Sequence, residues 1–155
     1  MSIDLVRKYL SKFGKDGDII ELDQSSATVE LAAKALGVIP ARIAKTLSFK
    51  VDNGCLLVVT AGDTRIDNKK FKEFFRTKAK MLTPNEVIDF TGHAIGGVCP
   101  FGLTTPDIKI YCDKSMQRFE TVFPACGSSN SAIELTCEEL FHISNCKEWV
   151  DVCKY

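Results

Sequence analysis

Ile43-Ala44-Lys45-Thr46-Leu47-Ser48-Phe49-Lys50-Val51-Asp52-Asn53-Gly54-Cys55-Leu56-Leu57-Val58-Val59-Thr60-Ala61 is the stretch of sequence that decides the fold. Leu47, Phe49 and Val51 alternate with polar residues, which is the two-residue period of a half-buried strand. Asp52-Asn53-Gly54 is a strong turn signal, and residues 55–61 form an apolar run typical of a central strand. The stretch therefore predicts a β-hairpin.

Helix signals surround this hairpin on both sides. Pro40 suits the first position of a short helix that we expect to run to about Ala44, just before the first strand. Two capping boxes, in which a threonine is followed three residues later by a glutamate, mark later helices. Further strands are expected at 107–112 and 132–135. Strands and helices that are mixed in this way, with some strands joined by tight turns, predict an α+β fold with a mixed, largely antiparallel sheet. The expected helix caps are Thr28, Asp67, Thr83 and Thr136.

Length and composition are those of one globular domain over residues 1–155, of which 45% are hydrophobic and 26% charged. No apolar run approaches the ~20 residues of a membrane helix, and the N-terminus has no secretory signal pattern, so we expect a cytosolic protein without a membrane partner. The formal net charge of zero argues against indiscriminate nucleic-acid binding. It leaves room for a local basic patch.

The seven cysteines are widely spaced and include no Cys-x-x-Cys pair, so we expect no metal site. In a reducing compartment, most of them are expected to be small buried hydrophobic residues.

The segment from Thr91 to Gly102 contains four glycines and a proline. Glycine allows close approach of the backbone to a ligand, so such a loop can hold a phosphate or stabilise an oxyanion, although an ordinary surface loop fits its composition as well. Cys99 and His93 in this segment could form a nucleophilic pair, a reading that the sequence leaves open.

Two basic features could meet a phosphate. Lys45, where the short helix is expected to pass into the strand, could reach a phosphate or a ribose hydroxyl, or be a solvated lysine at a helix end. The stretch 69–80 is the only strongly basic one and could meet an RNA backbone or be a solvated helix face. The residues of this stretch that we take as RNA-binding are Lys69, Lys70, Lys72 and Arg76.

Five blocks of the sequence, taken in order, resemble the YbaK-type aminoacyl-tRNA deacylases, which are related to the inserted editing domain of bacterial prolyl-tRNA synthetase. The resemblance extends from about residue 20 to residue 142. Its blocks are Ser26-Ala27-Thr28-Val29-Glu30 with the helix that follows, Ile43-Ala44-Lys45-Thr46-Leu47, Gly62-Asp63-Thr64-Arg65-Ile66-Asp67, Gly96-Gly97-Val98-Cys99-Pro100-Phe101-Gly102, and Gly127-Ser128-Ser129-Asn130 with Ile133-Glu134-Leu135.

The resemblance implies a barrel-like, mostly antiparallel sheet surrounded by helices. It implies a hydrolase that needs no cofactor and removes a small wrong amino acid (alanine, cysteine, serine or threonine) from tRNA, usually proline tRNA. The partners implied are the tRNA acceptor end and, in some cases, prolyl-tRNA synthetase. The catalytic residues by match are Lys45, Gly96, Gly97, Val98, Cys99 and Pro100. The substrate-binding residues expected are Thr28, Thr46, Asp63, Arg65, His93, Phe101, Gly127, Ser128 and Asn130.

Two other functions compete with the editing hydrolase. One is a non-catalytic relative that binds tRNA or a synthetase. The other is a hydrolase of another small ester or thioester that uses Cys99 as its nucleophile.

Overall fold

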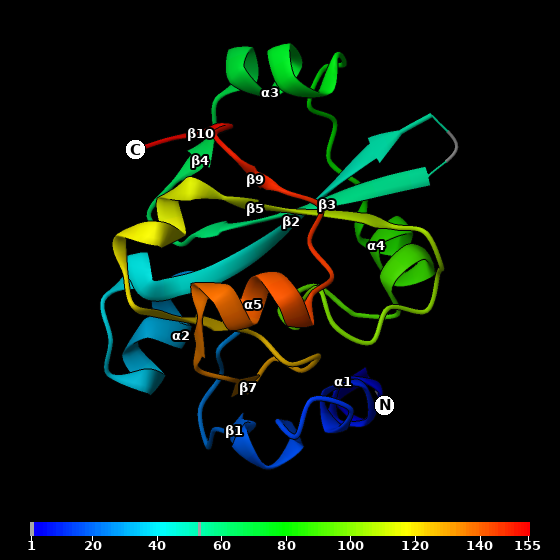
Figure 1. Cartoon of the computed structure of the whole chain (residues 1–155). Helices are drawn as coiled ribbons and strands as arrows, with labels where there is room; N and C mark the ends of the chain where they lie inside the picture. The colour runs from blue at the N-terminus through cyan, green and yellow to red at the C-terminus, as the bar shows by residue number, and fades with distance from the viewer. Residues whose placement is uncertain (1, 53) are drawn as a thin grey trace.

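The computed structural model describes residues 2–52 and 54–155, and the hairpin lies at its centre (Figure 1). Strand β2 (Ile43–Val51) pairs antiparallel with β3 (Gly54–Ala61), in a register that runs from Ala44 opposite Ala61 to Val51 opposite Gly54. The predicted hairpin is confirmed, while Asn53 of its turn lies outside the described residues.

The hairpin is the middle of a mixed sheet with the strand order β8-β6-β2-β3-β5-β9. Strands β2 and β3, and β6 and β8, are antiparallel, whereas β2 and β6, β3 and β5, and β5 and β9 are parallel. Two small antiparallel pairs, β1 with β7 and β4 with β10, stand apart from it. The α+β fold with a mixed sheet is confirmed, and most paired residues among those described are antiparallel partners. The remaining strands are β1 (Ile20–Glu21), β4 (Arg65–Ile66), β5 (Lys109–Asp113), β6 (Thr121–Pro124), β7 (Ser131–Ala132), β8 (Leu135–Thr136), β9 (Trp149–Val150) and β10 (Cys153–Lys154).

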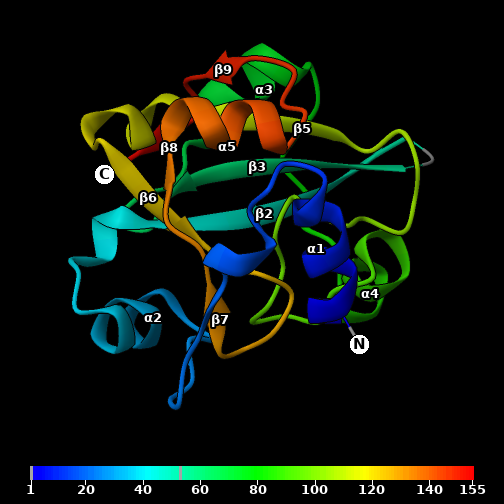
Figure 2. The same cartoon turned by 60° about the horizontal axis from the view of Figure 1, so that its bottom comes forward.

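Helices surround this sheet. In Figures 1 and 2, α1 and α5 lie on one side of it and α3 on the other, while α2 and α4 lie toward opposite ends of β2. The four predicted caps are confirmed, because the side chain of each accepts a hydrogen bond from a backbone N–H in the first turn of its helix. The α-helices are α1 (Ser2–Ser11), α2 (Val29–Leu36), α3 (Asn68–Phe75), α4 (Pro84–Thr91) and α5 (Cys137–Ile143), and the 3-10 helices are η1 (Asp16–Asp18), η2 (Pro40–Arg42) and η3 (Lys114–Arg118).

The short helix expected to reach about Ala44 ends earlier. Only Pro40–Arg42 is helical, and the strand begins at Ile43, which pairs with Phe123 of β6. Pairing with two neighbouring strands therefore extends the sheet backwards over this segment. Lys45 consequently lies within a strand and not at its beginning.

The hydrophobic core has two main parts, one on each face of β3. Leu57 and Val59 pack with α1 and α5, whereas Leu56 and Val58 pack with Phe71 of α3. Because both faces are covered, the strand carries a continuous apolar run in place of an alternating one. The expectation for the cysteines holds largely: all seven are free thiols, five are buried and two, Cys137 and Cys146, are half-buried.

Across residues 2–52 and 54–155, no helix has both the length and the apolar character needed to cross a membrane.

Candidate active site

A cavity of about 260 Å³ opens across β2, between α2 and α4. Its walls are largely apolar, and its rim includes part of the glycine-rich loop and the segment around β7. The apolar side chains that line it include those of Ala27, Val29, Ala32, Leu82, Val87 and Phe123.

Lys45 reaches this cavity from β2. Its side chain is half-buried, and its ammonium donates a hydrogen bond to the backbone carbonyl of Thr64. Burial lowers the pKa of Lys45, and the charges of Cys153, Asp63 and Glu30 act in the opposite direction. A partly desolvated cation therefore lies at the cavity wall, held only by a neutral carbonyl among the contacts described.

Two hydroxyl groups in the cavity lining have no hydrogen-bond partner among the described residues. They belong to Ser26, which is only 7% exposed, and to Thr46, next to the lysine. A buried hydroxyl without a partner costs about 1–3 kcal/mol. Thr28 also lines the cavity, but its hydroxyl accepts from the N–H of Leu31 at 3.2 Å as the cap of α2. Ser26 and Thr46 are therefore the residues of the lining whose buried hydroxyls have no partner among the described residues.

The glycine-rich loop contributes Gly96 and Val98 to the cavity lining. Gly96 has a φ of +99°, and a Cβ at this position would lie 3.1 Å from the Cβ of Ala27. Gly97 is buried behind it and donates its N–H to the carbonyl of Ala94 at 3.0 Å. Pro100 is buried and carries no N–H. Of the five loop residues expected to act, only Gly96 and Val98 line the cavity.

Cys99, His93 and Phe101 are all fully buried and none of them lines the cavity. The Cys99 Sγ does lie 3.6 Å from the His93 Nε2. However, His93 Nε2 donates to the carbonyl of Phe101 at 2.7 Å, and its Nδ1 accepts from the hydroxyl of Ser2. Burial raises the pKa of the Cys99 thiol to about 12 and lowers that of His93.

A reactive cysteine needs thiolate character and access, and Cys99 has neither. These surroundings do not favour Cys99 as a nucleophile. His93 lies outside the cavity lining as well, because its ring joins α1 to the glycine-rich loop inside the core.

Gly127, Ser128 and Asn130 lie behind the loop and not in the cavity lining. Gly127 donates its N–H to the carbonyl of Gly97 at 3.0 Å, and a Cβ on Gly97 would come within 2.7 Å of the Gly127 backbone. The Ser128 hydroxyl donates to the Asn130 Oδ1 at 2.9 Å and shares a hydrogen bond with the Ser131 hydroxyl at 2.6 Å, and the Asn130 amide donates to the carbonyl of Leu22 at 3.1 Å. These three residues support the glycine-rich loop and β7. The loop and β7 line the cavity, whereas the three residues themselves do not.

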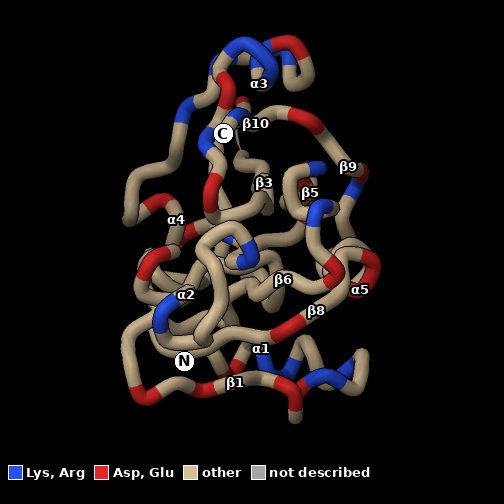
Figure 3. The backbone as a smooth tube through the Cα atoms, turned by 90° about the vertical axis from the view of Figure 1, so that its left-hand side faces the viewer, with Lys and Arg blue, Asp and Glu red and all other residues tan. Residues whose placement is uncertain are grey.

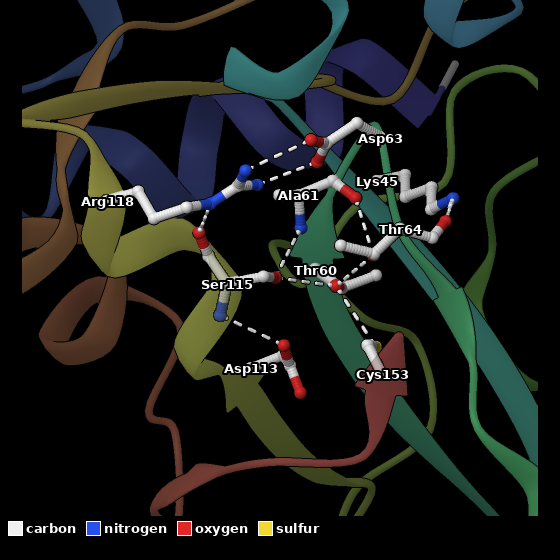
Figure 4. Close-up of polar contacts among 9 residues, drawn as sticks. All are labelled: Lys45, Thr60, Ala61, Asp63, Thr64, Asp113, Ser115, Arg118 and Cys153. Atoms are coloured by element: carbon white, nitrogen blue, oxygen red, sulfur yellow. Dashed lines mark hydrogen bonds and ion pairs between the residues drawn. The ribbon is translucent and has the colours of Figure 1, made fainter. Parts of the chain in front are cut away.

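Asp63 and Arg65 also lie outside the cavity lining. The Asp63 carboxylate accepts two hydrogen bonds from Arg118, at 3.0 and 2.7 Å (Figure 4). Arg65 is exposed on β4, opposite Lys154. The structure gives neither side chain a direct path to a ligand in the cavity.

The basic stretch gathers around α3, at the top of Figure 3. Lys69 and Lys72 line a second hollow of about 410 Å³ together with Lys78. Lys70 is engaged elsewhere, since its ammonium donates to Asp151 at 3.1 Å and to the carbonyl of Cys153 at 3.2 Å. Arg76 is the C-cap of α3, with a left-handed backbone.

A model of the aminoacyl-tRNA editing domain family matches residues 23–143 of this sequence, which include the cavity lining, Lys45 and the glycine-rich loop. The chain belongs to this family.

Individual relatives are similar to this chain over different lengths. The "Uncharacterized protein YwhH" of Bacillus subtilis (strain 168) is 54% identical over 155 residues, covering 99% of this chain and 98% of the relative. The proline–tRNA ligase of Thermotoga sp. (strain RQ2) is 31% identical over 91 residues, which are 58% of this chain but only 15% of the ligase. A crystal structure described as that of "a putative trans-editing enzyme for prolyl tRNA synthetase" superposes with a TM-score of 0.89 at 30% identity, over 99% of this chain and 98% of the other.

Sequence reasoning on this editing domain missed much of the cavity wall. Ser26 was noted only as part of a block, although its unpartnered hydroxyl is a useful signal once burial is known. Ser131 of β7 has no sequence signature at all. The other wall residues that were not anticipated are Met81, Leu82, Val87, Ile95 and Ala132. In the described part of the editing domain, no three His, Cys, Asp or Glu side chains are grouped so that they could hold a metal ion.

Proposed function

We propose that this editing domain is a trans-editing hydrolase that deacylates mischarged aminoacyl-tRNA, with proline tRNA carrying a small wrong amino acid as its substrate. The observation that carries the proposal is the cavity, whose lining brings together Lys45, the two residues with unpartnered hydroxyls, and Gly96 and Val98 of the glycine-rich loop. The family assignment supports the reaction class.

The size and lining of the cavity support a small amino acid. Its volume of about 260 Å³ is below the ~300–1,000 Å³ typical of pockets for larger ligands. Ser26 and Thr46 would receive the polar groups of the aminoacyl moiety, and the apolar wall would exclude larger side chains. Alanine, cysteine, serine and threonine are the candidates. Proline tRNA is proposed because similar sequences occur in proline–tRNA ligases and because a similar structure is described as a trans-editing enzyme for prolyl-tRNA synthetase.

In the proposed mechanism, the protein supplies position and electrostatics rather than a nucleophile of its own. Lys45 would leave the Thr64 carbonyl and bind the acceptor end of the tRNA, which orients the ester in the cavity. The N–H groups of Gly96 and Val98, the loop residues of the cavity lining, would donate to the oxyanion, since the Gly97 amide is engaged and Pro100 has none. Water or a group of the substrate itself, such as a ribose hydroxyl or a cysteine thiol, would attack the ester.

For the remainder of the tRNA we propose contacts around α3. Lys69, Lys72 and Lys78 surround a hollow with no acidic residue in its lining, so they suit a phosphate backbone. Lys70 is the weakest member of the set expected from sequence, because Asp151 already neutralises it. A protein with this substrate would act in the cytoplasm, and prolyl-tRNA synthetase is a candidate partner for its recruitment.

The test is a deacylation assay on proline tRNA charged with alanine, cysteine, serine or threonine, with the wild type and Lys45→Ala. Rapid loss of one or two of these esters, abolished in the variant, is the expected result. Tight tRNA binding without hydrolysis of any ester would favour the non-catalytic binding module. Absence of both binding and hydrolysis would refute the tRNA assignment.

A further inference from the structure

Arg118, which lies at the end of η3, is held by hydrogen bonds and by two aromatic rings. Its guanidinium donates two hydrogen bonds to the Asp63 carboxylate and one, from Nε, to the carbonyl of Ser115 at 2.7 Å (Figure 4). Two aromatic rings pack on it, with Phe119 at 4.9 Å and Tyr155 at 4.6 Å from the guanidinium carbon. The planar group is therefore oriented from several sides, as a bidentate pair requires.

Asp63 lies in the turn that holds the catalytic lysine. The next residue, Thr64, provides the carbonyl that accepts from the Lys45 ammonium. Asp63 and Lys45 are close enough for each to affect the other: the carboxylate raises the pKa of the lysine, and the ammonium lowers that of the aspartate. The other charged or titratable groups that act on Lys45 are Glu30 of α2 and Cys153 of β10.

We propose that Arg118 is a positioning residue that holds the Asp63 carboxylate away from the Lys45 ammonium and so keeps this ammonium available to the tRNA. That the ammonium is kept available to the tRNA rests on the proposed function. A carboxylate is a much stronger partner for an ammonium than a neutral carbonyl is. A lysine paired with Asp63 would have to break a salt bridge before it could bind the substrate, whereas a lysine on the Thr64 carbonyl exchanges a neutral acceptor for an anionic one on the tRNA.

The turn itself is anchored independently of Arg118. The Thr64 hydroxyl donates to the carbonyl of Ala61 at 2.8 Å and shares a hydrogen bond with the Thr60 hydroxyl at 2.8 Å. The Ser115 hydroxyl accepts from the N–H of Ala61 at 3.2 Å. Because these anchors are buried and remain in an Arg118→Ala variant, the turn is expected to keep its place. The freed carboxylate would then be able to turn toward Lys45.

The direct test measures the pKa of Lys45 by NMR titration of its side-chain ¹³Cε signal, which needs no tRNA. Four proteins are compared: the wild type, Arg118→Ala, Asp63→Asn and the double variant. The expected result is that Arg118→Ala raises the pKa of Lys45 by about one pH unit, the size of effect typical of a new opposite charge nearby. In the Asp63→Asn background, the same arginine substitution is expected to have no effect.

An unchanged Lys45 pKa in Arg118→Ala would refute the proposal. So would a rise of equal size in the Asp63→Asn background, because the effect would then not pass through the carboxylate. Arg118→Lys, which retains a charge beside Asp63, is expected to show most of the wild-type behaviour. Arg7→Ala is the matched control. It removes another arginine ion pair, between Arg7 and Glu21 at 3.6 Å, in the N-terminal part of the chain.

The activity measurement connects the positioning to the reaction. With an ester that the wild type hydrolyses, Arg118→Ala is expected to lower kcat/KM about tenfold, chiefly through KM, while Arg118→Ala with Asp63→Asn restores most of it. If kcat/KM stays low in the double variant, the inference is overturned. If the wild type hydrolyses no ester, the proposed function fails, and the NMR titration still decides whether Arg118 shields Lys45 from Asp63.

Discussion

Replacement of Thr46 by valine tests whether its hydroxyl serves a ligand or the fold. The two side chains have nearly the same shape and similar strand preferences, so the substitution removes chiefly the hydroxyl. That hydroxyl is buried at the cavity and has no partner among the described residues. Its removal takes away a group whose burial is unfavourable. The free energy of unfolding of Thr46→Val is therefore expected to be unchanged or higher than that of the wild type by up to ~1 kcal/mol.

Thr60 is a matched control on the neighbouring strand. Its hydroxyl is fully buried and shares hydrogen bonds with Thr64 at 2.8 Å, Ser115 at 3.0 Å and Cys153 at 3.2 Å. Its removal breaks several bonds of ~0.5–1.5 kcal/mol each, while the partners keep other contacts. Thr60→Val is thus expected to lower the free energy of unfolding by about 1–3 kcal/mol.

Urea unfolding followed by circular dichroism measures both effects, and deacylation of the best ester is measured in parallel. Thr46→Val is expected to lose about tenfold or more in kcat/KM while it keeps its stability, since a substrate group loses its partner. If Thr46→Val destabilised the protein as much as Thr60→Val and deacylated at the wild-type rate, the hydroxyl would serve the fold, and the reasoning would be refuted.

Three further predictions concern the loop, the buried thiol and the basic surface. Gly96→Ala places a Cβ at a φ of +99° and 3.1 Å from Ala27, so it should lower the free energy of unfolding by about 1–3 kcal/mol and remove most of the deacylation activity. Gly37→Ala is its control, at a φ of +70° with no neighbour within 4 Å, and it should show strain of a similar order but normal deacylation. Cys99, whose pKa is raised to about 12, should resist alkylation of the native protein at pH 8, and the Cys99→Ser variant should retain deacylation. Rapid labelling of Cys99 with loss of activity would contradict this prediction. Substitution of Lys69 or Lys72 by alanine should weaken tRNA binding and reduce the slope of log K against log salt by about 1 each, and an unchanged slope in filter-binding titrations would exclude α3 from the interface.

Local signals predicted much of the fold because their causes are local. The threonine and aspartate caps bond N–H groups two or three residues away, and the hairpin follows from alternation and a turn signal. The predicted end of the short helix at about Ala44 was wrong, because a strand distant in sequence pairs with this segment. Residues 43 and 44 pair with Phe123 and Pro124 of β6, about eighty residues further on, and this pairing turns the expected helix end into strand.

The candidate site likewise has residues that the sequence identified and contacts that only the structure shows. Lys45 and Gly96 could be identified through the family blocks that contain them, and both line the cavity. Asp63 belongs to such a block as well, but sequence could not reveal that Arg118 occupies its carboxylate, because the partners are 55 residues apart.

The sequence by itself determined the class of fold, the hairpin, the helix caps and, through its ordered blocks, the family. These depend on backbone preferences and on short-range patterns that the chain displays along its length. Only the tertiary structure decided which groups are accessible. It buried Cys99 and His93 in the core, engaged Lys70 with Asp151, and left the hydroxyls of Ser26 and Thr46 without partners among residues 2–52 and 54–155. Burial and partnership depend on long-range packing, which sets the solvation of each group and hence its chemistry.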